Sequence, residues 1–125
     1  MLLLICIIII FPSINTESAL CIREEEKSIC RGVDQNWLSR RLPRAKEIEI
    51  HDSQITFIGR NQIRNIAQTQ ILKFYNCSIE SIHFNAIYKR ANIINLGFIN
   101  NKLQNIPSQI LSSKIQLFDL RKFAH

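Results

Sequence analysis

Residues 93–106 read IINLGFINNKLQNI, and the same arrangement of apolar and polar residues occurs twice more in the chain. The earlier copies are AKEIEIHDSQITFI at residues 45–58 and TQILKFYNCSIESI at residues 69–82. Each copy begins 24 residues after the previous one. A constant period of this length indicates a fold made of stacked structural repeats.

Five positions of the repeat hold a large apolar side chain in every copy, when the first residue of each copy is counted as position one. Positions four and six are two residues apart, so in a β-strand both side chains lie on the same face. One copy cannot bury its apolar side chains alone, so neighbouring copies must stack. At positions four, six, eleven, fourteen and nineteen the residues are Ile48, Leu72, Leu96; Ile50, Phe74, Phe98; Ile55, Ile79, Leu103; Ile58, Ile82, Ile106; and Ile63, Ile87, Leu111.

The spacing L-x-x-L-x-L-x-x-N-x-L-x-x-L with this period resembles the leucine-rich repeat of extracellular proteins, over residues 45–114 as three repeats. The resemblance implies an α/β fold, a short right-handed leucine-rich-repeat solenoid (horseshoe) with parallel strands on its concave face. Each copy implies a strand over positions three to seven, then a turn and an irregular or short helical return. Position one departs from the pattern, because it holds Ala45 and Thr69 where leucine is usual.

Position nine holds Ser53, Cys77 and Asn101. In leucine-rich repeats this side chain lies inside the turn and forms hydrogen bonds with backbone groups of adjacent coils, which would otherwise be buried unpaired. Asparagine does this best, and serine and cysteine are small enough to replace it. We therefore expect these three to be ladder residues, and Cys77 to be buried rather than a reactive or intermolecular thiol.

The chain begins with an apolar run at residues 2–11, followed by Pro12 and a polar stretch. The run is too short to span a bilayer as a helix and has the length of a signal-peptide core. Cleavage after Ser18 would leave small residues at the positions that signal peptidase prefers. We expect residues 1–18 to be a signal peptide and the protein to be secreted and extracellular; the alternative is a short membrane-associated or buried apolar arm.

Cys21 and Cys30 lie nine residues apart and are expected to form a disulfide in an oxidising compartment. Residues 19–44 resemble the N-terminal cap of extracellular leucine-rich repeats, although such caps commonly have four cysteines. The chain as a whole resembles arthropod secreted leucine-rich-repeat proteins with a two-cysteine N-terminal cap, some of which act in innate immunity. In this cap we expect Trp37 in the core and Glu24–Glu26 on the solvated side.

After a third copy of 22 residues, Ile115, Phe118 and Leu120 fit positions one, four and six of a fourth copy. We expect residues 115–125 to be a partial fourth repeat without a C-terminal cap. The last coil would then expose apolar surface through which another chain can associate. Otherwise the sequence is a fragment of a longer protein, or the solenoid is marginally stable.

The outward positions of the strands form the candidate binding face, and the alternative is an unused face. Tyr75 with Ile71 and Ile99 is the best apolar contact patch, because exposed aromatic and aliphatic groups ringed by polar ones mark interaction sites. The candidate binding residues are Glu47, Glu49, His51, Ile71, Lys73, Tyr75, Asn95 and Ile99. Asn76-Cys77-Ser78 satisfies N-x-S/T, so Asn76 is a glycosylation candidate that is either occupied or vacant.

The formal net charge is +6, and it becomes +7 when residues 1–18 are removed, because that segment holds one acidic residue and no basic one. Nucleic-acid binding is not expected, because the basic residues lack interleaved aromatics and a nucleic-acid motif. One local basic cluster is formed by Arg40, Arg41, Arg44 and Lys46.

His51 lies near Glu49 and Asp52 in the sequence, which suggests a metal site or a general base. A histidine in such a pattern is more commonly a solvated side chain without either role. With no catalytic triad, glycine-rich phosphate loop or second nearby histidine, we expect no enzyme, cofactor or metal. The sequence favours a secreted, non-enzymatic module that binds a protein ligand or co-receptor, with no membrane association after signal cleavage. The alternatives are the N-terminal fragment of a larger leucine-rich-repeat receptor or matrix protein, and a cationic module for anionic glycan or membrane surfaces.

Overall fold

The computed structural model describes residues 20–40, 42–63, 66–87, 92–111 and 116–120. Outside the described residues lie the predicted signal peptide (1–18), Arg41 of the basic cluster, and Ile115 and residues 121–125 of the predicted fourth repeat.

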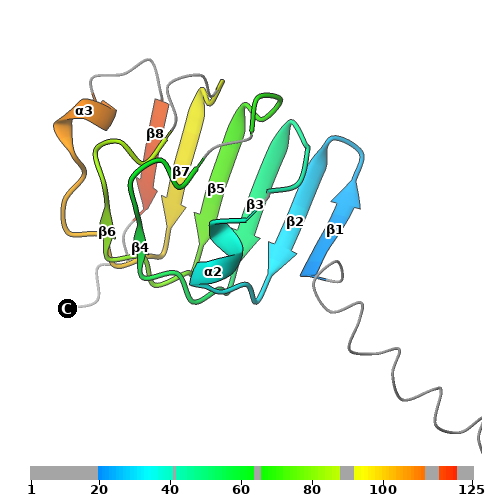
Figure 1. Ribbon diagram of the computed structural model, residues 1–125, viewed down its shortest axis with the longest axis horizontal. Coiled ribbons are helices and arrows are strands. Elements are labelled where there is room, and N and C mark those ends of the chain that lie inside the picture. The colour runs from blue at the N-terminus through cyan, green and yellow to red at the C-terminus, as the bar shows by residue number, and fades with distance from the viewer. Residues whose placement is uncertain (1–19, 41, 64–65, 88–91, 112–115, 121–125) are drawn as a thin grey trace, which may run out of the picture.

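The structure is mixed α/β, with a large sheet of mostly parallel strands, a small two-stranded sheet and few helices (Figure 1). The large sheet has the order β1-β2-β3-β5-β7-β8. All neighbours from β2 to β8 are parallel, whereas β1 is antiparallel to β2. The strands of this sheet are β1 Cys21–Glu24, β2 Lys27–Arg31, β3 Glu47–His51, β5 Ile71–Tyr75, β7 Asn95–Ile99 and β8 Gln116–Leu120.

The pairing register of β3, β5 and β7 follows the sequence period. Ile48 lies opposite Leu72, and Leu72 lies opposite Leu96, each 24 residues further along the chain. The predicted strands at positions three to seven of each copy are therefore confirmed, and so is their parallel pairing. Register matters here, because a slip of one residue would move every inward side chain to the opposite face.

One face of these three strands lies against the core. The rings of Phe74 and Phe98 stack on this face, with centroids 5.6 Å apart and planes 6° apart. Burial of each such side chain stabilises the fold by about 1.5–3 kcal/mol. The six side chains at positions four and six all have 0% exposure: Ile48, Ile50, Leu72, Phe74, Leu96 and Phe98.

The opposite side of the core is formed by the segments that return from one strand to the next. Here β4 (Phe57–Ile58) pairs in parallel with β6 (Ser81–Ile82). Figure 1 shows β4, β6 and helix α2 (Gln35–Leu38) over one face of the large sheet. The buried apolar side chains of the return segments include Ile55, Ile58, Ile63, Ile79, Ile82 and Leu103.

Thr69 and Ala45, which depart from leucine at position one, are both buried. The Thr69 hydroxyl donates a hydrogen bond of 2.7 Å to the carbonyl oxygen of Ala45. A buried hydroxyl is costly unless it is paired, and here the preceding copy supplies the acceptor. Position one therefore links two copies by a hydrogen bond in place of leucine packing.

The N-terminal segment covers the first end of the sheet with a hairpin and a short helix. Cys21 lies opposite Cys30 in the β1–β2 register, and the two form the predicted disulfide. The Asp34 side chain caps α2 by accepting a hydrogen bond of 2.9 Å from the Trp37 backbone N–H. Trp37 is buried, as predicted, and the side chains of Glu24–Glu26 are exposed. The antiparallel hairpin was not predicted.

The register of β8 corrects the predicted fourth copy. Leu117, not Phe118, lies opposite Leu96, and Asp119, not Leu120, lies opposite Phe98. Helix α3 (Ser108–Leu111) lies in the connection between β7 and β8. Paired residues of these two strands are 21 positions apart in the sequence, rather than the predicted 22. Adjacent apolar residues at 117 and 118 fit two strand phases, so the sequence pattern alone could not fix the register.

Candidate functional site

The outer face is the face of the large sheet opposite the core, where side chains at positions three, five and seven of β3, β5 and β7 lie. The strand register brings all eight predicted binding residues onto these three neighbouring strands. Glu49 is only 8% exposed, so it is not available as an open contact residue. The other seven are half-buried: Glu47, His51, Ile71, Lys73, Tyr75, Asn95 and Ile99.

Glu49 is held between a lysine and a histidine. Its Oε2 lies 2.9 Å from Nζ of Lys27 on β2, and its Oε1 lies 2.9 Å from Nε2 of His51. An ionised carboxylate only accepts hydrogen bonds, so both nitrogens donate to it. Beside it, Glu47 Oε2 lies 3.8 Å from Nζ of both Lys27 and Lys73. Sequence reasoning missed Lys27, because residues 27–31 match no copy of the repeat.

Burial alone would raise the pKa of the Glu49 carboxyl group. The hydrogen bonds from His51 and Lys27, together with the charge of Lys27, outweigh burial and lower this pKa from 4.5 to about 2. The hydrogen bond to Glu49 and its negative charge raise the pKa of Lys27 in turn. Glu49 is therefore ionised at neutral pH, and a carboxylate with so low a pKa is a weak general base.

His51 and Tyr75 form a stacked pair on the outer face. Their ring centroids are 4.3 Å apart and their planes differ by 5°, and the two residues are strand partners on β3 and β5. The hydrogen bond from His51 to Glu49 fixes the orientation of the imidazole. The two half-buried rings therefore face each other across neighbouring strands.

The predicted patch of Tyr75, Ile71 and Ile99 is divided in the structure. Ile99 is the strand partner of Tyr75 on β7. Ile71 lies four residues before Tyr75 on the same strand, about 13 Å away at the usual rise per residue. Lys73 lies between them and its side chain covers Gly97, where an added Cβ would stand 3.1 Å from Lys73 Cγ. The apolar contact surface is therefore His51, Tyr75 and Ile99, without Ile71.

A row of Asp and Asn side chains follows the ends of β3, β5 and β7. Asp52, Asn76 and Asn100 have φ angles of 49°, 54° and 57°, a region that Asn and Asp adopt more readily than other non-glycine residues. Asn76 Nδ2 donates to Asp52 Oδ1 at 2.8 Å, and Asn100 Nδ2 donates to Asn76 Oδ1 at 3.2 Å. The hydrogen bonds along this row were not predicted, although Asp or Asn at three positions spaced 24 residues apart is a signal that could have found them. Asn76 is exposed, as the glycosylation hypothesis requires.

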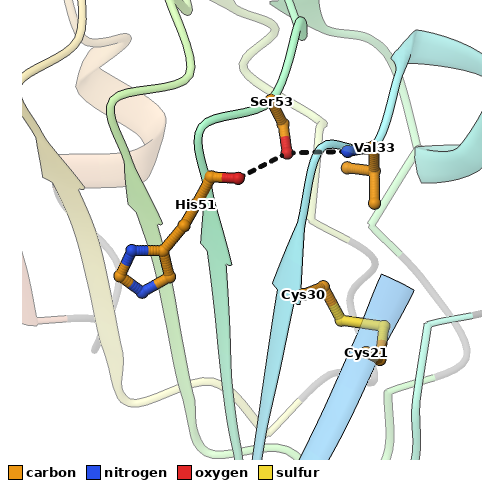
Figure 2. The surroundings of a disulfide bond; sticks show 5 residues. All are labelled: Cys21, Cys30, Val33, His51 and Ser53. Carbon is orange, nitrogen blue, oxygen red and sulfur yellow. Dashed lines mark hydrogen bonds between the residues drawn. A yellow bond between two sulfur atoms is a disulfide. The ribbon is translucent and has the colours of Figure 1, made fainter. Parts of the chain in front are cut away.

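Ser53 forms the first of the predicted ladder contacts, which Figure 2 shows beside the disulfide. Its Oγ accepts a hydrogen bond of 3.0 Å from the Val33 backbone N–H and donates one of 2.9 Å to the His51 carbonyl. The side chain therefore joins the N-terminal segment to the turn after β3.

Cys77 and Asn101 occupy the equivalent places in the next two turns. Cys77 has 0% exposure, and its Sγ lies 3.4 Å from the Ile50 carbonyl oxygen and 3.3 Å from that of Tyr75. Burial raises the pKa of this thiol to about 11, so the thiol stays protonated at neutral pH. Asn101 Oδ1 accepts from the backbone N–H groups of Cys77 and Ile79 at 3.1 and 3.2 Å. The buried positions predicted for Ser53 and Cys77 are thus confirmed, and Asn101 is half-buried.

The arrangement of acidic groups near His51 does not converge on a metal. Asp52 Oδ2 lies 3.5 Å from Arg31 Nη1, and its Oδ1 accepts from Asn76, so Asp52 is engaged away from Glu49. In the parts of the chain that the structure describes, no group of three or more His, Cys, Asp or Glu could hold a metal ion. No helix in these parts is long and apolar enough to cross a membrane.

No protein-family model matches the chain, and no curated protein sequence matches it significantly.

Proposed function

We propose that the chain is a small secreted leucine-rich-repeat protein whose outer face binds a protein ligand without chemical turnover. Three observations support the solenoid: the 24-residue register of β3, β5 and β7, the return segments paired through β4 and β6, and the position-nine hydrogen bonds. In such a solenoid the outer face of the sheet is the concave surface.

The observation that carries the binding proposal is the stacked pair of His51 and Tyr75, with Ile99 beside it. Half-exposed aromatic and aliphatic groups surrounded by polar side chains are typical of the residues that dominate binding energy. Glu49 already fixes the imidazole, so less side-chain entropy is lost on binding. The charges of Lys27, Glu47 and Glu49 are paired with one another, which favours a partner that contacts the rings.

The Cys21–Cys30 disulfide supports an extracellular location, because disulfides persist in oxidising compartments. The predicted signal peptide is tested by expressing the full chain in a eukaryotic secretory cell and sequencing the N-terminus of the product in the medium. We expect the product to begin at Ala19. Retention of the uncleaved chain inside the cell would contradict secretion.

The binding proposal is tested by capturing proteins from extracellular fluid of the source organism with immobilised wild type, Tyr75→Ala and Phe57→Ala. Phe57 is a matched control, because it is an exposed aromatic on β4, away from the outer face. A ligand of this face should bind wild type and Phe57→Ala, and lose about tenfold or more of its affinity for Tyr75→Ala. If no captured protein distinguishes Tyr75→Ala from Phe57→Ala, the proposal is wrong; circular dichroism confirms that both variants are folded.

A further inference from the structure

A hollow of about 710 Å³ lies where the segments leading into β3 and β5 run beside each other. Its volume is within the roughly 300–1,000 Å³ that is usual for ligand sites. It is separate from the outer face, since it involves none of the residues proposed above to bind protein. Its lining residues are Arg40, Leu42, Arg44, Ile66, Ala67, Gln68 and Thr69.

The described lining is cationic and contains no acidic side chain. Arg40 and Arg44 are both exposed and contribute two guanidinium groups. A third guanidinium is close, because Arg23 Nη1 donates a hydrogen bond to the Arg44 carbonyl oxygen. The Arg23 guanidinium also donates to the Glu25 carbonyl oxygen, and neither Glu25 nor Glu26 lines the hollow. With a formal net charge of +6, the whole chain also attracts anions to this surface.

The rest of the lining suits a sugar ring with charged substituents. Leu42 and Ile66 are largely buried and supply an apolar part of the lining. The Thr69 hydroxyl donates its hydrogen to the Ala45 carbonyl oxygen, so Thr69 offers a ligand mainly its methyl group. Gln68 is exposed and offers a side-chain amide for hydrogen bonding. Arginine presents a planar fork of donors that matches the oxygens of sulfate, phosphate and carboxylate groups.

We propose that this hollow binds a sulfated oligosaccharide, with a sulfate ester on Arg44 and a sugar ring against the apolar part of the lining. The concave shape favours an inserted anionic group over a flat anionic membrane, which would contact protruding side chains instead. The site is independent of the outer face, so either proposal stands if the other fails.

The test compares full-chain wild type with Arg44→Gln and Arg60→Gln, using an immobilised heparin-derived octasaccharide. Arg60 is the matched control, because it is also exposed, lines a different hollow beside Phe57, and its replacement changes the net charge equally. We expect Arg44→Gln to weaken binding about tenfold and Arg60→Gln less than about twofold, since loss of a charge-assisted bond outweighs a diffuse charge effect. If the two substitutions weakened octasaccharide binding equally, the attraction would be diffuse and the proposed site would be wrong.

Two further arms separate geometry from charge and glycan from lipid. Arg44→Lys keeps the charge but loses the fork, so its affinity should fall between those of wild type and Arg44→Gln. Vesicles containing phosphatidylserine should bind less well than the octasaccharide at equal ionic strength. The proposal would be overturned if wild type bound the vesicles but not the octasaccharide. It would also be overturned if wild type bound the octasaccharide no more tightly than a desulfated octasaccharide.

Discussion

At the scale of single residues, Asn101 makes four hydrogen bonds, whereas Ser53 and Cys77 make two each at the equivalent position. Its amide nitrogen donates to the carbonyl oxygens of Phe74 and Ile99, and its amide oxygen accepts two backbone N–H groups. Asparagine combines donors and acceptors in one planar group, which a hydroxyl or thiol cannot match. The turn after β7 should therefore depend on its position-nine side chain more than the other two turns.

We predict that Asn101→Ala lowers the free energy of unfolding by about 2–4 kcal/mol, because several backbone groups lose their partner. Urea unfolding measures the loss. The matched control is Asn105→Ala, at an exposed residue, which should change stability by less than about 0.5 kcal/mol. Similar losses in the two variants would mean that the amide contacts contribute little.

The lowered pKa of Glu49 predicts that the free energy of unfolding depends on pH in the acidic range. Its pKa in the folded protein is about 2, below the ordinary 4.5, so the folded state favours the ionised form. The resulting stabilisation is fully present above pH 4.5 and is lost as the pH falls from 4.5 towards 2. Urea midpoints of wild type and Glu49→Gln should therefore converge over this interval, while Glu80→Gln, at an exposed carboxylate, should follow wild type. A constant difference between wild type and Glu49→Gln from pH 7 to pH 2.5 would contradict this account.

At the scale of elements, β1 pairs with no described strand other than β2, and it carries mostly exposed side chains. The disulfide joins these two strands across a short loop, so its contribution through the unfolded chain is about 2–3 kcal/mol. The inner strand β2 is also paired with β3 and buries Ser28 and Cys30.

We therefore predict that the Cys21→Ala/Cys30→Ala double variant frees β1 but leaves β2 in the sheet. Hydrogen exchange read by mass spectrometry should show lost protection at residues 21–24, with residues 27–31 retaining most of theirs. Wild type in the absence of reductant provides the reference. Equal loss over both strands would show that the disulfide holds the whole hairpin, not its outer strand alone.

The elements could be predicted from sequence where the repeat was present and not where it was absent. The strands containing Ile48, Leu72 and Leu96 follow from apolar residues in fixed alternation. The β1–β2 hairpin does not, because no other copy contains it, and Lys27 was lost from the candidate site with it. The register of β8 failed for a different reason: Leu117 and Phe118 are adjacent apolar residues, and connection length decides between them.

At the scale of the whole molecule, stability is shared between neighbouring copies, because each strand and return segment contacts the next. Phe74 lies in the middle copy and stacks on Phe98 of the following one. Loss of this contact should therefore weaken the described sheet as a whole and not one copy alone.

We predict that Phe74→Ala lowers the free energy of unfolding by about 3–5 kcal/mol, through lost burial and the cavity left behind. Trp37 is the only tryptophan in the chain and reports on the N-terminal segment, whereas far-UV circular dichroism reports on all strands. Both signals should shift together in Phe74→Ala. An unchanged Trp37 transition beside a shifted dichroism transition would show that the N-terminal segment unfolds independently. Phe57→Ala, at an exposed ring, serves as the control.

Under the proposed secretion, the burial of Cys77 would also set an order of events during synthesis. It is the central residue of the Asn76-Cys77-Ser78 acceptor and has 0% exposure once the turn has formed. A transferase that must take the tripeptide into its own cleft can do so only before that turn closes. The fraction of chains that carry a glycan at Asn76 would then report how fast the second copy docks on the first copy in the secretory pathway.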